Sequence, residues 1–344
     1  MDIAVPPKYT NSRFLLFPPT TSPEKGQSIV RCSTPTDAQG RYWHWDKLKD
    51  LQPPKDWSVE EWWAGMKWAR NRQAKNLPFV GKNGEAFNLV TPACVLTQLN
   101  WLEQNLRQRY PISEAGLGGG SGAAQVRMVE AASSCALDSV AEMRVPRLSF
   151  LQEGREPQNA DEWMISSNHQ ALELILGRSA AELTPDLMLE LQRLLVSHPF
   201  ADSSKVGRFR MEEDGIGELW HDPPKVTGLE ERLFRICSFA NDPVAMGILI
   251  HPIVASVILH LMILYDQPFA AANGRLARAL FLWSMLKNGY EHAELLSLSS
   301  VLIAARGHYE RSFRYVVSDG NDATYFVIHQ LDALIKACQG YRAE

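Results

Sequence analysis

The fold is decided by the stretch Gln267-Pro268-Phe269-Ala270-Ala271-Ala272-Asn273-Gly274-Arg275-Leu276-Ala277-Arg278. Its second half has the features of an anion site. A helix that begins near Gly274 places Arg275 and Arg278 on one face, and the free backbone N–H groups at a helix start favour a negative charge. Its first half holds glutamine and three alanines, which supply neither a base nor a metal ligand. The stretch therefore predicts a site that holds a phosphate and has little chemistry to apply to it.

The composition excludes several classes of protein. The net charge of −4 gives no basic field for nucleic acid. No segment approaches the ~20 apolar residues that cross a bilayer, and the N-terminus from Met1 to Ser12 lacks the apolar core of a signal peptide. The five cysteines are odd in number and have no C-x-x-C spacing, which argues against a disulfide framework or a zinc site. We expect a cytoplasmic protein without nucleic-acid or membrane partners.

The N-terminal third divides into three parts. Residues 1–40 are rich in Pro, Ser and Thr and predict an extended arm. Residues 41–115 hold most of the tryptophans and predict a helical, Trp-rich region, in which the tryptophans serve packing or docking. Ser58, with Glu61 three residues later, predicts a capped helix start. Residues 116–123 form a Gly-rich linker, and no Gly-Lys-Ser/Thr follows it, so it is no phosphate-binding loop of that kind.

Residues 124–344 are dominated by helical periodicity. The predicted helices are 124–143, 158–178, 184–197, 226–240, 243–265, 274–288, 297–304, 306–318 and 322–338. The exception is about 206–219, where three glycines bracket Arg208-Phe209-Arg210 and predict a short β-hairpin, with both arginines solvating it. The class is therefore all-α with one small hairpin.

The core stretch and its surroundings resemble the Fic family, whose core motif reads H-P-F-x-D/E-G-N-G-R-x-x-R. Four more segments are similar to the family in the same order, so the resemblance spans about residues 125–340. They are Glu153–Pro157, Val206–Arg210 (the family's segment ahead of a hairpin called the flap), Trp283–Tyr290 and Asp319–Phe326. The resemblance implies a Fic-like helical core with a small β-hairpin flap, preceded by the Trp-rich helical region.

The family's usual activity is the transfer of AMP from ATP to a hydroxyl of a target protein. The resemblance implies a histidine as general base, an acidic residue that holds Mg²⁺, and an Asn-Gly turn with two arginines that binds the phosphates. In this chain Gln267, Ala271 and Ala272 replace the histidine, the metal ligand and the first glycine of the motif. The nucleotide-binding residues Asn273, Gly274, Arg275 and Arg278 remain. We therefore expect ATP or another nucleotide to bind with Mg²⁺ weakened or absent.

Three other groups are candidates for a replacement base. Asp266 adjoins Gln267, so it is expected to point elsewhere. His251 and His260 are nine residues apart, which places them on opposite sides of a helix. Phe269 is expected to be a packing anchor, and Tyr309 either belongs to the core or borders the nucleotide pocket.

A further segment resembles the family's inhibitory helix, S/T-x-x-x-E-G/N, whose glutamate pairs with the second arginine of the motif. Ser134 and Asp138 occupy the matching positions, followed by Ser139. Because aspartate is one methylene shorter, we expect its pair with Arg278 to be strained or water-mediated. The alternative is a helix cap or a surface aspartate.

Three functions follow. The first is a degenerate Fic protein, inactive or strongly impaired in AMP transfer, which binds a nucleotide and acts by binding an unknown target protein through its flap or Trp-rich surface. The second is an active transferase with a non-standard base. The third is an interaction module with an empty pocket.

Overall fold

The computed structural model describes residues 3–7, 18, 20–107, 121–138, 148–214 and 221–343. The fold is mostly helical with one two-stranded antiparallel hairpin, as predicted. In chain order the elements are α1 Pro23–Cys32, α2 Trp45–Leu48, α3 Val59–Gln73, β1 Lys75–Val80, β2 Ala86–Leu89, α4 Ala93–Leu106, α5 Ser121–Asp138, α6 Ser149–Gln152, α7 Ala160–Gly177, α8 Pro185–Val196, η1 Ser203–Lys205, α9 Leu229–Asn241, α10 Pro252–Asp266, α11 Asn273–Lys287, η2 Glu291–Leu295, α12 Leu298–Ala304, α13 Arg306–Ser318 and α14 Thr324–Ala343.

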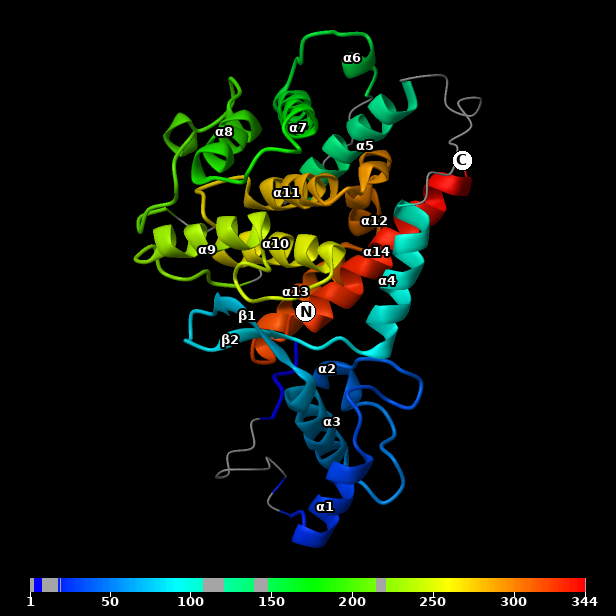
Figure 1. Cartoon of the computed structure of the whole chain (residues 1–344). Coiled ribbons are helices and arrows are strands. Elements are labelled where there is room, and N and C mark those ends of the chain that lie inside the picture. The colour runs from blue at the N-terminus through cyan, green and yellow to red at the C-terminus, as the bar shows by residue number, and fades with distance from the viewer. Residues whose placement is uncertain are drawn as a thin grey trace.

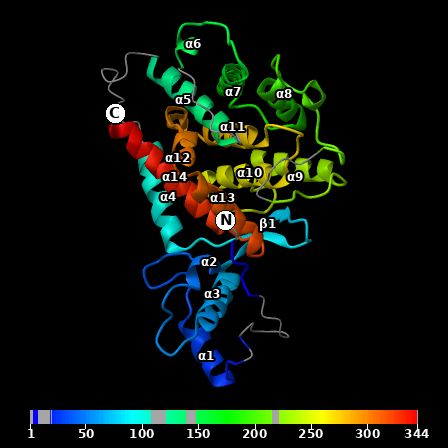
Figure 2. The same cartoon turned by 180° about the vertical axis from the view of Figure 1, so that it is seen from behind.

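Helix α10 forms the centre of the core. Every residue from Ile253 to Asp266 is buried, because the helix is apolar on all sides. It packs along α11, and α9, α13 and α14 cover its other faces (Figures 1 and 2). The core motif is the connection between α10 and α11, so the two most buried helices of the chain hold it from both ends.

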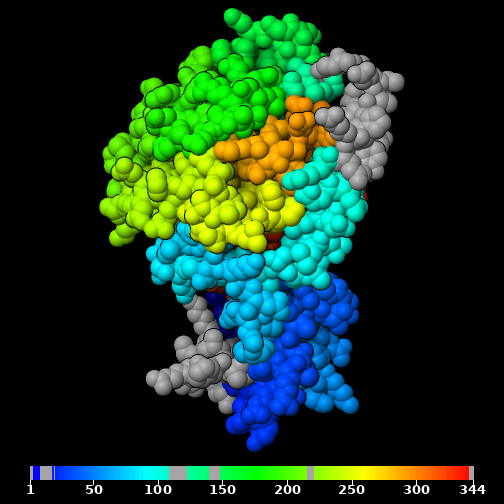
Figure 3. Space-filling view, in the orientation of Figure 1, coloured from blue at the N-terminus to red at the C-terminus, as the bar shows by residue number. Residues whose placement is uncertain are grey.

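The N-terminal region forms a narrower lobe beside the helical core (Figures 1 and 3). Helix α3 begins as predicted, with a capping box between Ser58 and Glu61. The arm 1–40 is not extended throughout, because Pro23–Cys32 forms α1, which the side chain of Ser22 caps. The prediction missed α1 because Pro and Ser read as breakers, although both stabilise a helix start.

The hairpin is β1–β2, within the region predicted to be helical, and not at 206–219. The prediction of a hairpin there was wrong for residues 206–214, which contain no strand; residues 215–219 lie outside the described part. Phe209 forms only an isolated antiparallel bridge with Phe269. Strand β2 is tied to the core by Asn88, whose backbone bonds the loop before α14 at Asn321 and Ala323.

A buried arginine joins the N-terminal lobe to the core. Arg70 of α3 donates to the hydroxyl of Tyr325 on α14 at 2.7 Å, to the carbonyl oxygen of Trp43 at 2.8 Å and to that of Pro35 at 2.9 Å. Nearby, Lys67 of α3 pairs with Asp319 at 2.9 Å. These contacts pair charged groups across the junction, and loss of one partner would leave the other charge uncompensated. The lobe and the core are therefore packed against each other as one unit.

Several predicted helices have different bounds in the structure: α9 begins at Leu229 instead of residue 226, and α14 runs to Ala343 instead of residue 338. The helix predicted over 243–265 begins only at Pro252, because Pro243 and Gly247 hold the chain in turns ahead of it. Helix α5 begins at Ser121, inside the predicted linker 116–123, and its described part ends at Asp138. Within the described residues, no helix is long and apolar enough to span a bilayer.

Candidate functional site

The motif loop is closed by Asn273. Its side chain accepts a hydrogen bond from the Phe269 N–H at 3.0 Å and donates to the Phe269 carbonyl oxygen at 2.7 Å. Phe269 is buried and stacks on Phe209, with ring centroids 5.1 Å apart. Phe269 is therefore a packing anchor, as predicted, and Asn273 shapes the loop.

Gln267 caps helix α10. Its side-chain Nε2 donates to the Leu264 carbonyl oxygen at 2.7 Å, and its backbone is left-handed with φ 45°. Arg210 completes the cap by donating to the carbonyl oxygens of Gln267 at 2.6 Å and Asp266 at 3.2 Å, and to that of Pro224. The expectation that Arg210 solvates a hairpin was wrong, because Arg210 is buried against these carbonyls. The residue at the base position thus donates a hydrogen bond to its own helix.

The N-terminus of α11 already holds an anion, the carboxylate of Asp138. Oδ2 of Asp138 accepts from the Arg275 backbone N–H at 3.1 Å. A Cβ added to Gly274 would lie 2.3 Å from Asp138 Oδ1, so only glycine leaves room for the carboxylate here. Asp138 is the last described residue of α5, which runs onto α11 (Figure 1). The cradle that the sequence predicts for a phosphate is therefore filled from within the chain.

Arg278 binds the same carboxylate. Its Nη2 lies 2.7 Å from Asp138 Oδ1, and it also donates to Ser134 Oγ and to the Ser134 carbonyl oxygen, both at 2.8 Å. Burial is the largest single effect and lowers the pKa of Arg278, but Asp138, Tyr309 and Glu130 together raise it, and the net pKa is raised. The pair is direct, so the expected strained or water-mediated contact is wrong: the end of α5 lies close enough for the shorter side chain to reach. Ser139 lies outside the described residues.

Arg275 is only partly satisfied. Its Nη1 donates to the Leu195 carbonyl oxygen at 2.7 Å. Its Nε is buried without a hydrogen-bond partner, and the nearest carboxylate oxygen, Asp138 Oδ2, is 3.7 Å away. An orphaned buried donor on a cation has a site for one more acceptor oxygen.

His198 is an ionisable group near the motif that sequence reasoning missed. Burial is the larger cause that lowers its pKa, and the charge of Arg275 lowers it further. Its Nδ1 is buried without a hydrogen-bond partner. No motif position marks His198, since it follows α8 and reaches the site only through tertiary packing. Its position within residues 125–340, the part of the chain that resembles the family, was the available indication of a role.

The three candidate replacement bases are all engaged in contacts with other side chains. Asp266 accepts from Arg232 Nε at 2.9 Å. His251 caps the start of α10 and lies 3.1 Å from a carboxylate oxygen of Glu103. His260 is fully buried, and its Nε2 lies 2.8 Å from the Tyr309 hydroxyl.

Tyr309 belongs to the core. It is 1% exposed, and burial raises its pKa well above the ordinary value. The charge of Arg278 acts on this pKa in the opposite direction, because the Tyr309 hydroxyl lies close to the Arg278 guanidinium. Tyr309 is therefore a core residue that contacts Arg278.

The residues of the loop do not fit a bound magnesium ion. Ala271, at the position of the family's metal ligand, has no oxygen in its side chain. Across the described residues, no group of three or more His, Cys, Asp and Glu side chains could hold a metal. Mg²⁺ prefers oxygen ligands from carboxylates, and none is offered at this position.

The fold and site define a helical domain with an arginine-lined anion cradle between two core helices. Residues 182–285 match the model of the Fic/DOC family, and the chain contains a Fic/DOC family domain. A relative from Nematostella vectensis, Protein adenylyltransferase Fic, is 27% identical over 150 residues, which are 43% of this chain and 32% of that protein. The chain thus matches about a third of the length of this curated relative, and it is related to protein adenylyltransferases.

Two solved structures share the fold. A Fic family protein from Desulfovibrio desulfuricans superposes with a TM-score of 0.58 at 18% identity, covering 73% of this chain and 74% of that chain. A Fic domain containing signaling protein from Bacteroides thetaiotaomicron has a TM-score of 0.50 at 18% identity, covering 72% and 98%. At this identity they show the fold alone.

Proposed function

We propose that this protein is a degenerate Fic protein that keeps an anion site, closes it with its own Asp138, and is strongly impaired in AMP transfer. The observation that carries the proposal is the Asp138 carboxylate on the Arg275 N–H and the Arg278 guanidinium. A carboxylate and a phosphate oxygen bind the same donors. A ligand therefore enters only when Asp138 leaves.

The transfer chemistry lacks two parts. Gln267 cannot accept a proton near neutral pH and is engaged with the Leu264 carbonyl oxygen. Loss of a general base costs roughly 10²–10⁴-fold in rate. Ala271 offers no oxygen to a metal that would neutralise charge on the phosphates. The missing base and the missing metal ligand act on the same step, so the rate of AMP transfer falls well below that of a complete site.

Retained binding rests on three groups: the N–H donors at the start of α11, Arg278, and the unsatisfied Nε of Arg275. A triphosphate or pyrophosphate offers more oxygens than a carboxylate and would satisfy that orphaned donor. ATP or another nucleotide is the ligand class of this proposal. The protein would act in the cytoplasm by binding a target protein through the segment 206–214 or the Trp-rich lobe.

A second candidate function is supported by His198. It is the histidine that lies near Arg275, and its lowered pKa keeps it neutral and able to accept a proton at pH 7. In this alternative the domain is an active transferase that uses His198 as its base.

The test compares the wild type with Asp138→Ala, and uses Asp186→Ala, which removes an exposed first-turn aspartate of α8, as the control. ATP, ADP and pyrophosphate are added and the melting temperature is measured. Labelled ATP is used in parallel to detect transfer to the protein itself or to lysate proteins. We expect all three ligands to raise the melting temperature of Asp138→Ala more than that of the wild type or the control, with no label transferred.

Two results would overturn the proposal. Robust label transfer by the wild type supports the active enzyme, and its loss in His198→Ala would identify the base. The absence of any ligand-induced shift in Asp138→Ala leaves an interaction module without a nucleotide site.

A further inference from the structure

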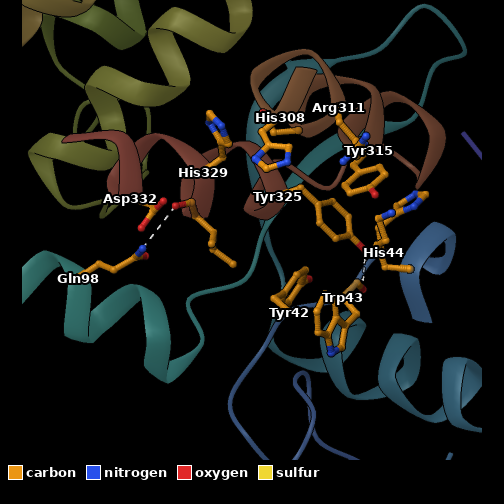
Figure 4. A pocket seen from close by; sticks show the side chains of 13 residues that line it. Tyr42, Trp43, His44, Gln98, His308, Arg311, Tyr315, Tyr325, His329 and Asp332 are labelled. Atoms are coloured by element: carbon orange, nitrogen blue, oxygen red, sulfur yellow. Dashed lines mark hydrogen bonds between the residues drawn. The ribbon is translucent and has the colours of Figure 1, made fainter. Parts of the chain in front are cut away.

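A cavity of about 380 Å³ lies between the N-terminal lobe and the C-terminal helices, and none of the motif residues line it. Its walls come from the segment 42–47, from α4, and from α13 and α14 (Figure 4). Seven of its thirteen lining residues carry aromatic or imidazole rings: Tyr42, Trp43, His44, His308, Tyr315, Tyr325 and His329. Ligand sites commonly have this size and this kind of lining.

The tyrosine rings of the cavity are held in place by carboxylates outside it. The hydroxyl of Tyr42 donates to Asp322 at 2.6 Å, that of Tyr315 to Asp46 at 3.0 Å, and that of Tyr325 to Asp319 at 2.8 Å. Each hydroxyl donates its proton to a carboxylate, so the rings present mainly carbon surface to the cavity. Side chains fixed in this way lose little entropy when a ligand binds.

His44 extends the same wall. Its ring stacks on that of Tyr315 with centroids 4.0 Å apart and planes 8° from parallel. Its Nδ1 accepts from the Asp46 backbone N–H at 3.1 Å, and its Nε2 lies 3.1 Å from the Ser318 hydroxyl. Both nitrogens are therefore engaged, and because His44 is 1% exposed, its ring supports Tyr315 from behind and does not face the cavity broadly.

The charges at the cavity favour an anion. Lys47 and Arg311 line it, and Arg311 lies beside the ring of Tyr315 (Figure 4). The acidic lining residue, Asp332, pairs with Lys336 at 2.7 Å. Arg70 lies 3.6 Å from the centroid of the Tyr42 ring, so that ring already binds a cation. A second cation in the cavity would be repelled.

At the opposite end of the cavity from Arg311 lies Gln98 (Figure 4). Its Nε2 bonds the Ile328 carbonyl oxygen at 3.4 Å, whereas its Oε1 is buried without a partner. Because Oε1 is buried, Gln98 closes this end of the cavity without presenting its side-chain oxygen to it.

We propose that this cavity binds a small planar aromatic anion, with its ring against the half-buried Tyr42 and Tyr315 and its negative group toward Lys47 and Arg311. A fused two-ring aromatic acid is small enough for a cavity of this volume. The site does not depend on the state of Asp138, because its lining contains no residue of the motif or of α5.

The experiment titrates the full-length protein with three matched probes: 2-naphthoate, its neutral amide, and 2-naphthylmethylammonium. Binding is measured by ligand-observed NMR and calorimetry. For a ligand of this size, we expect a dissociation constant of about 1 mM or tighter for the anion. We expect the amide to bind about tenfold more weakly and the cation not to bind, because Lys47 and Arg311 favour negative charge.

Variants locate the site. Lys47→Gln should weaken naphthoate binding about threefold and Arg311→Gln about tenfold, because one side chain is exposed and the other is partly buried. Lys49→Gln, an exposed lysine two residues away that does not line the cavity, is the control.

The proposal is overturned if 2-naphthoate does not bind, or if the three probes bind equally well. It is also overturned if Lys47→Gln and Arg311→Gln leave naphthoate binding unchanged. Naphthoate binding that persists unchanged in Asp138→Ala, together with the expected losses in these two variants, supports a site separate from the motif.

Discussion

The carboxylate of Asp138 lies 2.7 Å from Nη2 of Arg278, across 140 residues of sequence. The two partners differ in exposure, since the Arg278 side chain is 3% exposed and that of Asp138 26%. Arg278 is also held by Ser134, while Asp138 belongs to the end of its helix. The arginine is therefore the fixed half of the pair and the aspartate is the half that a competing anion can displace.

A double-mutant cycle measures this pair. Asp138→Ala, Arg278→Met and the double variant are unfolded in urea, with tryptophan fluorescence as the signal. We expect a coupling free energy of about 1–3 kcal/mol, because loss of one partner leaves the other uncompensated in a mostly buried site.

The control for this cycle is the exposed pair Arg235–Glu231 on α9, at a similar 2.7 Å. Its coupling should be only about 0.3–0.5 kcal/mol, as for other i,i+4 pairs in solvent. Equal coupling free energies in the two cycles would contradict the claim that the Asp138–Arg278 pair is stronger than an exposed pair.

Ala272 strains the motif loop. Its φ is 66°, in the left-handed region where a Cβ is disfavoured and glycine is not. We expect Ala272→Gly to raise the free energy of unfolding by about 0.5–1 kcal/mol, since relief of strain exceeds the added entropy of the unfolded chain.

Ala271→Gly is the control for this strain, because residue 271 has no positive φ. It should lower the free energy of unfolding or leave it unchanged. If chemical denaturation shows the same effect for both glycines, the strain at Ala272 does not exist.

Acid should destabilise the fold through His44. Burial lowers its pKa from 6.5 to about 3, and the charges of Arg70 and Lys67 add to this effect while Asp46 opposes it. The unfolded chain therefore binds a proton that the folded chain excludes. The stabilisation is complete above pH 6.5 and is lost as the pH falls toward 3, by up to ~1.4 kcal/mol per pH unit.

The variant His44→Gln isolates this contribution. The buried carboxylates Glu130, Asp266 and Asp319 have raised pKa values and act in the opposite direction, but they do so equally in both proteins. We expect the loss of unfolding free energy between pH 6 and pH 4 to be smaller in His44→Gln than in the wild type. Identical pH dependence would show that His44 titrates normally.

Much of the helical core could be predicted because its periodicity is strong. Helices α7, α8 and α11 fall within one or two residues of the predicted bounds. The hairpin could not be placed correctly: glycines near residue 207 suggested turns, whereas β1 and β2 depend on packing against the core through Phe79 and Phe87.

The candidate site was partly predictable for the same kind of reason. Spacing along the motif indicated that Arg275 and Arg278 share a face, and the resemblance pointed to Ser134 and Asp138. The resemblance did not predict the direct contact between Asp138 and Arg278, because that contact depends on how α5 packs on α11. His198 and the aromatic cavity carry no local signal, since both are assembled from segments far apart in the chain.

Restoring the motif tests which losses matter for transfer. Gln267→His alone should give no detectable transfer from labelled ATP, because Ala271 still offers no metal ligand and Asp138 still fills the cradle. The combined change Gln267→His, Ala271→Asp, Ala272→Gly and Asp138→Ala supplies a base, a Mg²⁺ ligand, an unstrained loop and an open site. We expect transfer to appear in this variant, to require Mg²⁺, and to disappear when Arg278→Ala is added. Transfer by the single Gln267→His variant would instead show that neither the metal ligand nor the removal of Asp138 is needed.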